Sequence, residues 1–239
     1  APIVVLLRRL WIAATSLVAA RRGYGGRVEE RRPGLDPAVA EVRLAVRRAL
    51  ADLEPGGTVL VALSGGADSL ALAAATAFEA PKLGLRAASL TVDHGLQDGS
   101  TDAAAAAATT SEALGLEARV ARVGVGAAGG PEAAAREARY RALADGARAI
   151  GAAAILTGHT LDDQAETVLL GLARGAGATS LQGMAEASVL AGIPLLRPLL
   201  GVRRDTTRAA CAAEALEPWD DPHNADPRFA RVRVRETVL

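Results

Sequence analysis

One stretch, residues 58–72 with the sequence TVLVALSGGADSLAL, constrains the fold of this chain more than any other. It opens with a continuous apolar run rich in β-branched side chains, which is typical of a strand buried on both faces of a parallel sheet. Leu70, Leu72 and their neighbours then begin a second apolar run of different period, which we expect to be a helix. The stretch therefore predicts a strand, a tight turn and a helix, the basic unit of an α/β domain.

The turn within this stretch has the composition of a phosphate-binding loop. It consists of Ser64, Gly65, Gly66, Ala67, Asp68 and Ser69. Adjacent glycines tolerate positive φ angles and let a ligand approach the backbone closely. The N–H groups of such a turn and of the helix behind it favour an anion. Similar turns also occur in α/β domains that bind no ligand, so the pattern alone leaves both interpretations open.

The rest of the chain alternates between helical and strand patterns. Asp36 and Pro37 have the composition of a helix start, and glycine-rich or polar turns separate the segments that follow. We expect further strands at 86–92, 116–123 and 154–157, and helices at 36–53, 69–80, 102–114, 131–151, 161–170 and 202–216. This alternation predicts an α/β fold with a doubly wound, mostly parallel sheet and helices on both faces.

A second informative stretch, GHTLDDQAETVLL at 158–170, concentrates negative charge at a helix start. Asp162 and Asp163 suit the positive end of the helix dipole, and helical spacing places Glu166 over both. Capping explains one aspartate but not Glu166. Because three carboxylates on one turn repel each other, we expect a cationic substrate group or a metal ion nearby. His159 alone is better explained by packing or hydrogen bonding than by catalysis.

Net charge, cysteine content and the apolar N-terminal segment limit the kinds of protein that this chain can be. The formal net charge is zero, which argues against overall attraction to nucleic acid and leaves only local arginine clusters. The single cysteine, Cys211, excludes an internal disulfide and a CxxC site, so we expect a reducing, cytoplasmic setting. Arg8 and Arg9 interrupt the apolar N-terminal segment before it is long enough to span a membrane, and no other span is predicted.

Several motifs together resemble one family of enzymes. SGGADS resembles the PP-loop of the N-type ATP pyrophosphatases, which cleave ATP between its α and β phosphates. Over about 58–239 the chain resembles the tRNA(Ile)-lysidine synthetases, because its motifs occur in the same order and with approximately the same spacing. After SGGADS these motifs are VDHGL, EAAAREARY, GHTLDDQAETVLL, RGAG with LQGM, RPLL, WDDPHN and FARVRVR. The resemblance implies adenylation of the wobble cytidine of tRNA(Ile) with a CAU anticodon. Free L-lysine then displaces AMP, so the products are lysidine, AMP and pyrophosphate.

The resemblance also implies roles for individual residues on the nucleotide side of the site. The six turn residues Ser64, Gly65, Gly66, Ala67, Asp68 and Ser69 would hold the phosphates of ATP. Asp68 would in addition help to place Mg²⁺, which offsets the charge of the departing pyrophosphate. His94 and Gly158 would contribute to nucleotide binding from the ends of two other predicted strands.

On the opposite side of the reaction, the resemblance assigns the lysine ammonium to Asp163 and Glu166. Arg139 and Arg231 would reach the nucleotide phosphates, a role suited to the forked guanidinium group. Two positions depart from the family pattern: Gln97 stands where an arginine is frequent, and Val232 where an asparagine is frequent. The effect of both departures is open.

The predicted organisation is an N-terminal extension at 1–35, a catalytic PP-loop domain at 36–223 and an arginine-rich C-terminal helix at 224–239. Many family members continue into further tRNA-binding domains, so the chain has the extent of a fragment or a short form. Two alternatives remain: a PP-loop tRNA thiolase, which usually needs more cysteines, and a non-catalytic ATP- or AMP-binding module. The sequence leaves the oligomeric state, including a homodimer, open.

Overall fold

A computed structural model describes residues 34–95, 99–124, 131–175, 182–219 and 233–234. Contacts divide the chain into the units Ala1–Gly34 and Leu35–Leu239, and the fold described below is that of the second unit. Its described strands are β1 (Thr58–Ala62), β2 (Arg86–Asp93), β3 (Glu117–Arg122), β4 (Ala154–Leu156), β5 (Ala187–Leu190) and β6 (Ile193–Leu196). Its described helices are α2 (Pro37–Leu50), α3 (Ala67–Glu79), the 3₁₀ helix η1 (Ala80–Leu83), α4 (Ser100–Ala113), α5 (Pro131–Ala149), α6 (Leu161–Ala173) and α7 (Arg204–Ala213).

The strands form one sheet in the order β3-β2-β1-β4-β6-β5. The pairs β1–β2, β1–β4, β2–β3 and β4–β6 are parallel, and only the edge pair β5–β6 is antiparallel. The chain moves outward from β1 to β3 and then returns to the other side of β1 at β4. The predicted doubly wound, mostly parallel sheet is confirmed. Its strand order reverses between β1 and β4, the place where such sheets bind ligands.

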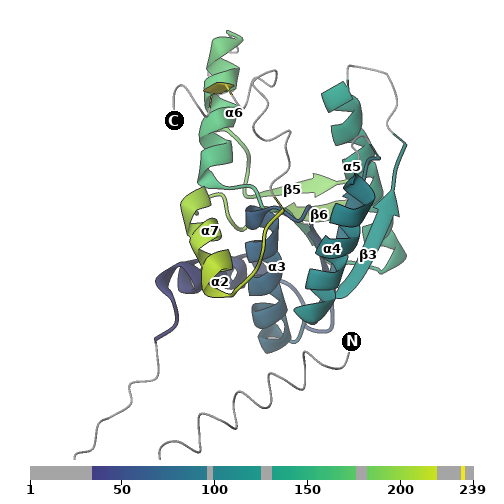
Figure 1. The fold of residues 1–239 in the computed structure, drawn as a ribbon, viewed down its shortest axis with the longest axis vertical. Coiled ribbons are helices and arrows are strands. Elements are labelled where there is room, and N and C mark those ends of the chain that lie inside the picture. Colours follow the sequence, from purple (N-terminus) through teal and green to yellow (C-terminus); the bar gives the residue numbers. More distant parts are fainter. Residues whose placement is uncertain (1–33, 96–98, 125–130, 176–181, 220–232, 235–239) are drawn as a thin grey trace, which may run out of the picture. The chain divides into compact units, whose positions relative to one another are not determined.

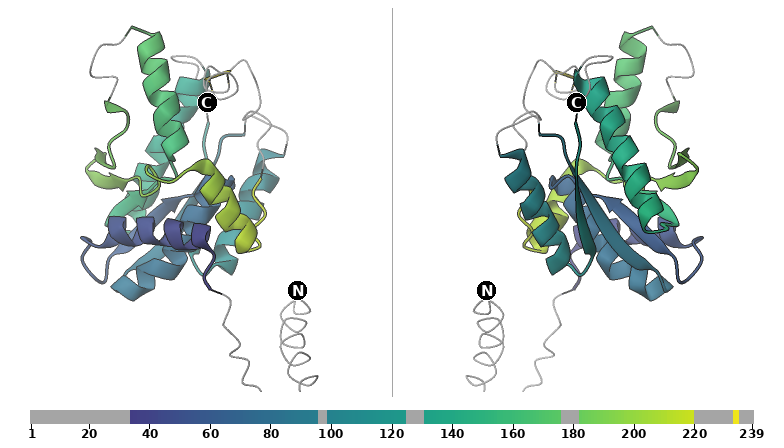
Figure 2. Two further views of the ribbon diagram at one scale, coloured as in Figure 1. Left: turned by 90° about the vertical axis from the view of Figure 1, so that its left-hand side faces the viewer. Right: turned by 90° about the vertical axis from the view of Figure 1, so that its right-hand side faces the viewer.

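Helices cover both faces of the sheet (Figures 1 and 2). Val59 and Val61 of β1 pack into a cluster that includes side chains of α2, α3 and α7. Leu60, which points to the opposite face, packs with Leu143 and Ala147 of α5. Successive residues of a strand point to opposite faces of the sheet, and helices cover both faces. All three β1 side chains are therefore fully buried. The prediction of a strand buried on both faces is confirmed.

The predicted helix at 36–53 forms as α2, although it ends earlier, at Leu50. Asp36 caps its start, since the carboxylate accepts hydrogen bonds from the N–H groups of Ala38 at 2.8 Å and Val39 at 3.5 Å. The apolar face of α2 then packs on α3 and α7. These contacts hold α7 beside the start of α3, which is the helix that follows the glycine-rich turn.

The expected elements and the structure differ most in the last third of the chain. No strand is predicted between 181 and 200, yet β5 and β6 form a hairpin there. The helix expected at 202–216 is shorter, from Arg204 to Ala213. Most of the predicted extension at 1–35 and C-terminal helix at 224–239 lies outside the described residues, so the domain boundaries stay predictions. None of the described helices combines the length and apolar character needed to cross a bilayer.

Candidate active site

The glycine-rich turn after β1 is shaped by the hydroxyl group of Ser69. This hydroxyl accepts a hydrogen bond from the N–H of Ser64 at 3.1 Å and donates one to the carbonyl of Gly66 at 2.9 Å. Gly65, between them, has a φ of +87°, a conformation that a residue with a side chain rarely adopts. The chain after β1 is therefore folded into a closed turn by its own side chains and needs glycine at this position.

Helix α3 begins inside this turn, at Ala67 rather than at the predicted Ser69. Gly66 occupies the N-cap position, and no side chain caps the helix. The first N–H groups of α3 consequently remain available for an anionic ligand, and they lie at the positive end of the helix dipole. Asp68 lies in the first turn of the same helix. The predicted turn and helix start are therefore present, and the binding of phosphate by them stays a prediction.

Gly158, which follows β4, packs against the backbone of α3. A Cβ atom at this position would lie 3.0 Å from the carbonyl carbon and oxygen of Asp68 and 3.2 Å from the N of Ser69. Even a methyl group would therefore press on the first turn of α3, where the N–H groups predicted to bind phosphate lie. This close approach gives Gly158 a packing role, while its predicted contact with a nucleotide stays a prediction.

Replacing Gly158 by Ala should displace α3 and weaken nucleotide binding. Because the contact is with backbone atoms, overpacking should cost about 1–3 kcal/mol of the free energy of unfolding. Urea denaturation and ATP titration measure the two effects. The matched control is Gly201→Ala, where an added Cβ meets nothing within 4 Å. Equal stability and ATP affinity in both variants would show that Gly158 does not set the position of α3.

The first turn of α6 carries the predicted acidic cluster. Thr160 caps this helix in a capping box with Asp163, whose Oδ2 accepts hydrogen bonds from the N–H of Thr160 at 2.8 Å and from its hydroxyl at 3.0 Å. Glu166 is fully buried one turn later. Capping therefore accounts for one oxygen of Asp163 and leaves the burial of Glu166 to be explained by another partner.

That partner is Arg204, which the sequence analysis did not identify. Its guanidinium group lies 2.9 Å from Oδ1 of Asp163 and 3.3 Å from Oε1 of Glu166. Its backbone N–H also donates a hydrogen bond to Asp162, at 2.8 Å. The expected cationic substrate group or metal ion stays a prediction, and Arg204 is a further cation beside these carboxylates. A protein cation from α7 already neutralises part of their charge.

Arg204 also connects the acidic cluster to the start of α3. Its Nε lies 3.5 Å from Oδ2 of Asp68, and the hydroxyl of Thr207, one turn further along α7, donates a short hydrogen bond to Oδ1 of Asp68. Burial raises the pKa of Asp68, although Thr207 and Arg204 oppose the shift. Asp68 and Asp163 thus contact the same guanidinium group, so the nucleotide and amine sides of the predicted site lie next to each other.

Arg139 of α5 acts electrostatically on two histidines, His94 and His159, that follow strands of the sheet. Burial, reinforced by the charge of Arg139, lowers the pKa of His94. Burial also lowers the pKa of His159 to about 4, with Asp163 opposing the shift and Arg139 reinforcing it. His159 hydrogen-bonds through Nδ1 to the hydroxyl of Thr157 at 3.0 Å. In both cases the pKa shift favours the neutral histidine, and the charge of Arg139 contributes to it.

Asp93, the residue before His94, is anchored by hydrogen bonds at the end of β2. Asp93 is almost completely buried and accepts hydrogen bonds from the N–H of Gly95 at 2.9 Å and from the hydroxyl groups of Ser100 at 2.8 Å and Thr101 at 2.9 Å. These bonds lower the pKa of Asp93 to about 2. The hydrogen bonds to Ser100 and Thr101 thereby tie the end of β2 to the start of α4. Arg231, Gln97 and Val232 lie outside the described residues.

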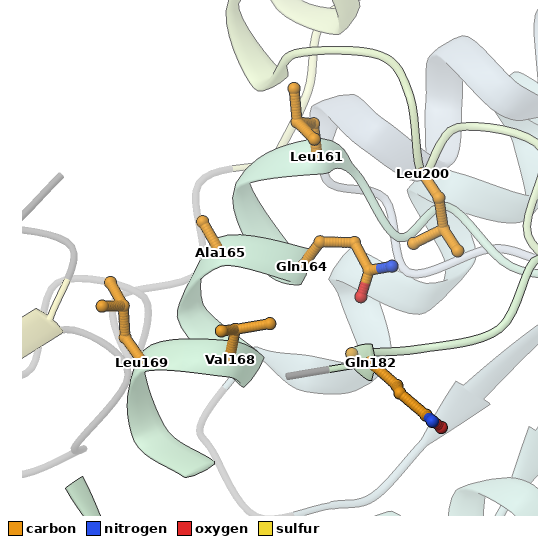
Figure 3. A pocket seen from close by; sticks show the side chains of 8 residues that line it. Leu161, Gln164, Ala165, Val168, Leu169, Gln182 and Leu200 are labelled. Atoms are coloured by element: carbon orange, nitrogen blue, oxygen red, sulfur yellow. The ribbon is translucent and has the colours of Figure 1, made fainter. Parts of the chain in front are cut away.

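The outer face of α6 borders a hollow that contains none of the predicted site residues (Figure 3). The hollow has a volume of about 550 Å³ and is lined mainly by apolar side chains, among them Leu161, Val168 and Leu200. Gln164, which also lines the hollow, forms two hydrogen bonds between its side-chain amide and the backbone of Met184, at 2.7 and 2.5 Å. Helix α6 therefore presents an acidic face to Arg204 and an apolar face to this hollow.

Fold and site together define a class: α/β domains with a glycine-rich turn at the reversal point of a doubly wound sheet, the place where such sheets bind ligands. Within this class, the model of the PP-loop domain family matches residues 40–239, so the chain belongs to the PP-loop domain family. The resemblance based on SGGADS is confirmed at the level of the family.

Curated relatives are similar over most of the chain. A protein of Salinispora tropica named tRNA(Ile)-lysidine synthase is 63% identical over 207 residues, which is 86% of this chain and 62% of that protein. A protein of the same name from Thermobifida fusca is 58% identical over 208 residues, 86% of this chain and 63% of that protein. The chain therefore spans about three fifths of the length of these relatives.

A solved structure confirms the fold independently. The U34-tRNA thiolase NcsA from Methanococcus maripaludis, which has a [4Fe-4S] cluster, superposes with a TM-score of 0.70 at 20% identity and covers 83% of this chain and 70% of that one. At this identity the likeness concerns the fold alone.

Proposed function

We propose that this chain binds ATP and carries the catalytic site for ligation of free L-lysine to the wobble cytidine of tRNA(Ile) with a CAU anticodon. Two arguments support the proposal. The PP-loop family and the uncapped start of α3 support use of ATP. The similarity to proteins named tRNA(Ile)-lysidine synthase supports lysine and tRNA(Ile) as the other substrates.

The observation that carries the proposal is the shared contact of Asp68 and Asp163 with Arg204. The proposed phosphate site at Asp68 and the proposed amine site at Asp163 would therefore be separated only by the guanidinium group of Arg204. In the first step, the carbonyl oxygen at C2 of the cytidine would attack the α-phosphorus of ATP and release pyrophosphate. In the second, the ε-amine of lysine would attack C2 and release AMP, so that one C–N bond replaces the C–O bond.

The residues divide this work according to their charge. The N–H groups at the start of α3 and the guanidinium of Arg139 would bind the phosphates and stabilise the negative charge of the leaving pyrophosphate. Asp163 and Glu166 would bind the lysine ammonium and orient it, and a carboxylate there is also placed to accept the proton that the amine loses. Arg231 would add a further phosphate contact from the C-terminal segment.

Asp68 suits a magnesium ion that is bound largely by the substrate. Among the residues that the structure describes, no group of three or more acidic, histidine or cysteine side chains forms a metal cage. Mg²⁺ commonly takes one or two carboxylates together with phosphate oxygens and water, and Asp68, a partly exposed carboxylate beside the phosphate site, matches that donor set. The ion would offset the charge on the phosphates.

The thiolase alternative is not favoured. Its structural support is a likeness of fold, and the present chain contains one cysteine, Cys211. This cysteine is buried in α7, where burial raises its pKa to about 11 and keeps it as the unreactive thiol. A non-catalytic nucleotide-binding module is the remaining alternative, and it has no need for an acidic cluster beside the phosphate site.

Incubation of the protein with ATP, radiolabelled lysine and tRNA(Ile) bearing a CAU anticodon tests the proposal. We expect label in the tRNA, together with AMP and pyrophosphate in equal amounts. A tRNA with the anticodon changed to GAU serves as the control, because it lacks the wobble cytidine, and should take up no label. ATP binding without label in either tRNA would instead support the nucleotide-binding module.

A further inference from the structure

We propose that Arg204 is a positioning residue that fixes the amine pocket relative to the phosphate-binding helix and sets the charge of that pocket. This inference rests on the proposed function and names a residue that none of the sequence motifs identified. Arg204 begins α7, forty-one residues after Asp163 in the chain, and reaches two other helix starts.

The geometry around Arg204 joins three helices. Its side chain is only 13% exposed and lies 2.9 Å from Asp163, 3.3 Å from Glu166 and 3.5 Å from Asp68. Its backbone N–H is held by Asp162 at 2.8 Å, and the N–H of Leu161 is held by the carbonyl of Val202 at 2.9 Å. The starts of α3, α6 and α7 are therefore linked to one another through Arg204 and its neighbours.

This arrangement requires the shape of arginine as well as its charge. The guanidinium group is planar and presents donors in several directions, whereas the ammonium of lysine is a compact charge on a flexible stem. Here Nη2 faces Asp163, Nη1 faces Glu166 and Nε faces Asp68, so each carboxylate has its own donor atom. A lysine at this position would keep the positive charge but would lose the link between α3 and α6.

The charge balance explains how a pocket that already contains an arginine can still attract an amine. Asp68, Asp163 and Glu166 bring up to three negative charges against the single positive charge of Arg204. The remaining negative charge favours one further cation, and the carboxylates in turn raise the pKa of Arg204 despite its burial. Without Arg204, mutual repulsion would push the carboxylates apart or protonate one of them.

Arg204→Lys, made in the full-length protein, separates this role from a merely structural one. We expect the KM for lysine to rise about tenfold or more, with tRNA-dependent release of pyrophosphate in the absence of lysine retained to within about threefold. The control is Arg208→Lys, an exposed arginine on the same helix, which should change neither quantity. The midpoint of thermal unfolding, measured for both variants, reports any loss of folding.

A second variant keeps the test decisive if Arg204→Lys does not fold. Asp162→Ala removes the acceptor that holds the backbone of Arg204 without altering the guanidinium group, and it should raise the KM for lysine about threefold. An unchanged KM for lysine in each folded variant, measured against a wild-type protein that does transfer lysine, overturns the inference about Arg204. Failure of the wild type to transfer lysine would instead overturn the proposed function.

Discussion

Replacing Glu166 by Gln should lower the kcat/KM for lysine about 100-fold while leaving the affinity for ATP within about threefold. Glu166 is fully buried and contacts Arg204 through Oε1. A glutamine keeps the shape of this side chain and can still accept that hydrogen bond, but it lacks the negative charge that would hold an ammonium group. Loss of one partner in a buried charge pair commonly costs about 2–5 kcal/mol, and the expected 100-fold loss of kcat/KM lies within this range.

Glu166 is a better probe of the amine pocket than Asp163, because Asp163 also caps α6 and its replacement would disturb the helix start. A matched control is Glu137→Gln on α5, where the glutamate is exposed and paired with Arg141. Lysine-dependent release of AMP and direct ATP titration measure the two quantities. An equal loss of lysine use and ATP binding would mean that Glu166 stabilises the whole site and does not bind the amine.

Replacing Asp68 by Asn should reduce the tRNA-dependent release of pyrophosphate about 100-fold, even when lysine is absent. Asparagine keeps an acceptor for the hydroxyl of Thr207 but removes the charge that faces Arg204 and that would help to hold Mg²⁺. The defect should therefore shrink as the Mg²⁺ concentration rises, since a weakened metal site is refilled by mass action. The measurement is pyrophosphate release at a series of Mg²⁺ concentrations.

Asp102→Asn is the control for this experiment, because Asp102 is an exposed aspartate in the first turn of the neighbouring helix α4. It should leave pyrophosphate release unchanged. The role given to Asp68 is wrong if Asp68→Asn releases pyrophosphate at the wild-type rate, or if its defect is the same at every Mg²⁺ concentration while ATP still binds. The second outcome would assign Asp68 to packing against α7.

The sequence allowed the centre of this site to be predicted because local chemistry and sheet topology agree there. The apolar run before Ser64 has the pattern of a doubly buried strand, and the turn after it lacks bulky side chains. Parallel strands bring their carboxyl ends to one edge, so the turn after β1 and the segment after β4 had to be neighbours. Asp68, Gly158 and Asp163 lie near this edge for that reason, while their roles were implied by the family resemblance.

The hairpin of β5 and β6 was missed because its sequence signals are weak or contrary. Its two turn residues, Ala191 and Gly192, both have positive φ, which is typical of a type I′ turn, yet alanine is unusual at the first position. Pro194 lies within β6 although proline is normally excluded from inner strands. It is tolerated because the pairing of β6 with β4 begins only at Leu195.

Arg204 was missed for a different reason. Charge repulsion among Asp162, Asp163 and Glu166 indicated that a cation must lie nearby, but nothing in a single sequence says which distant arginine supplies it. The choice depends on how α7 packs against α2 and α3, which places the first residue of α7 beside both acidic helix starts. Long-range packing of this kind has no local sequence pattern.

The most direct test is a crystal structure with a non-hydrolysable ATP analogue and lysine bound together. The phosphates should contact the N–H groups at the start of α3, and the lysine ammonium should lie beside Asp163 and Glu166, on the side of α6 that faces Arg204. Density for lysine in the apolar hollow around Val168, or phosphates bound away from Asp68, would contradict the arrangement of substrates argued above.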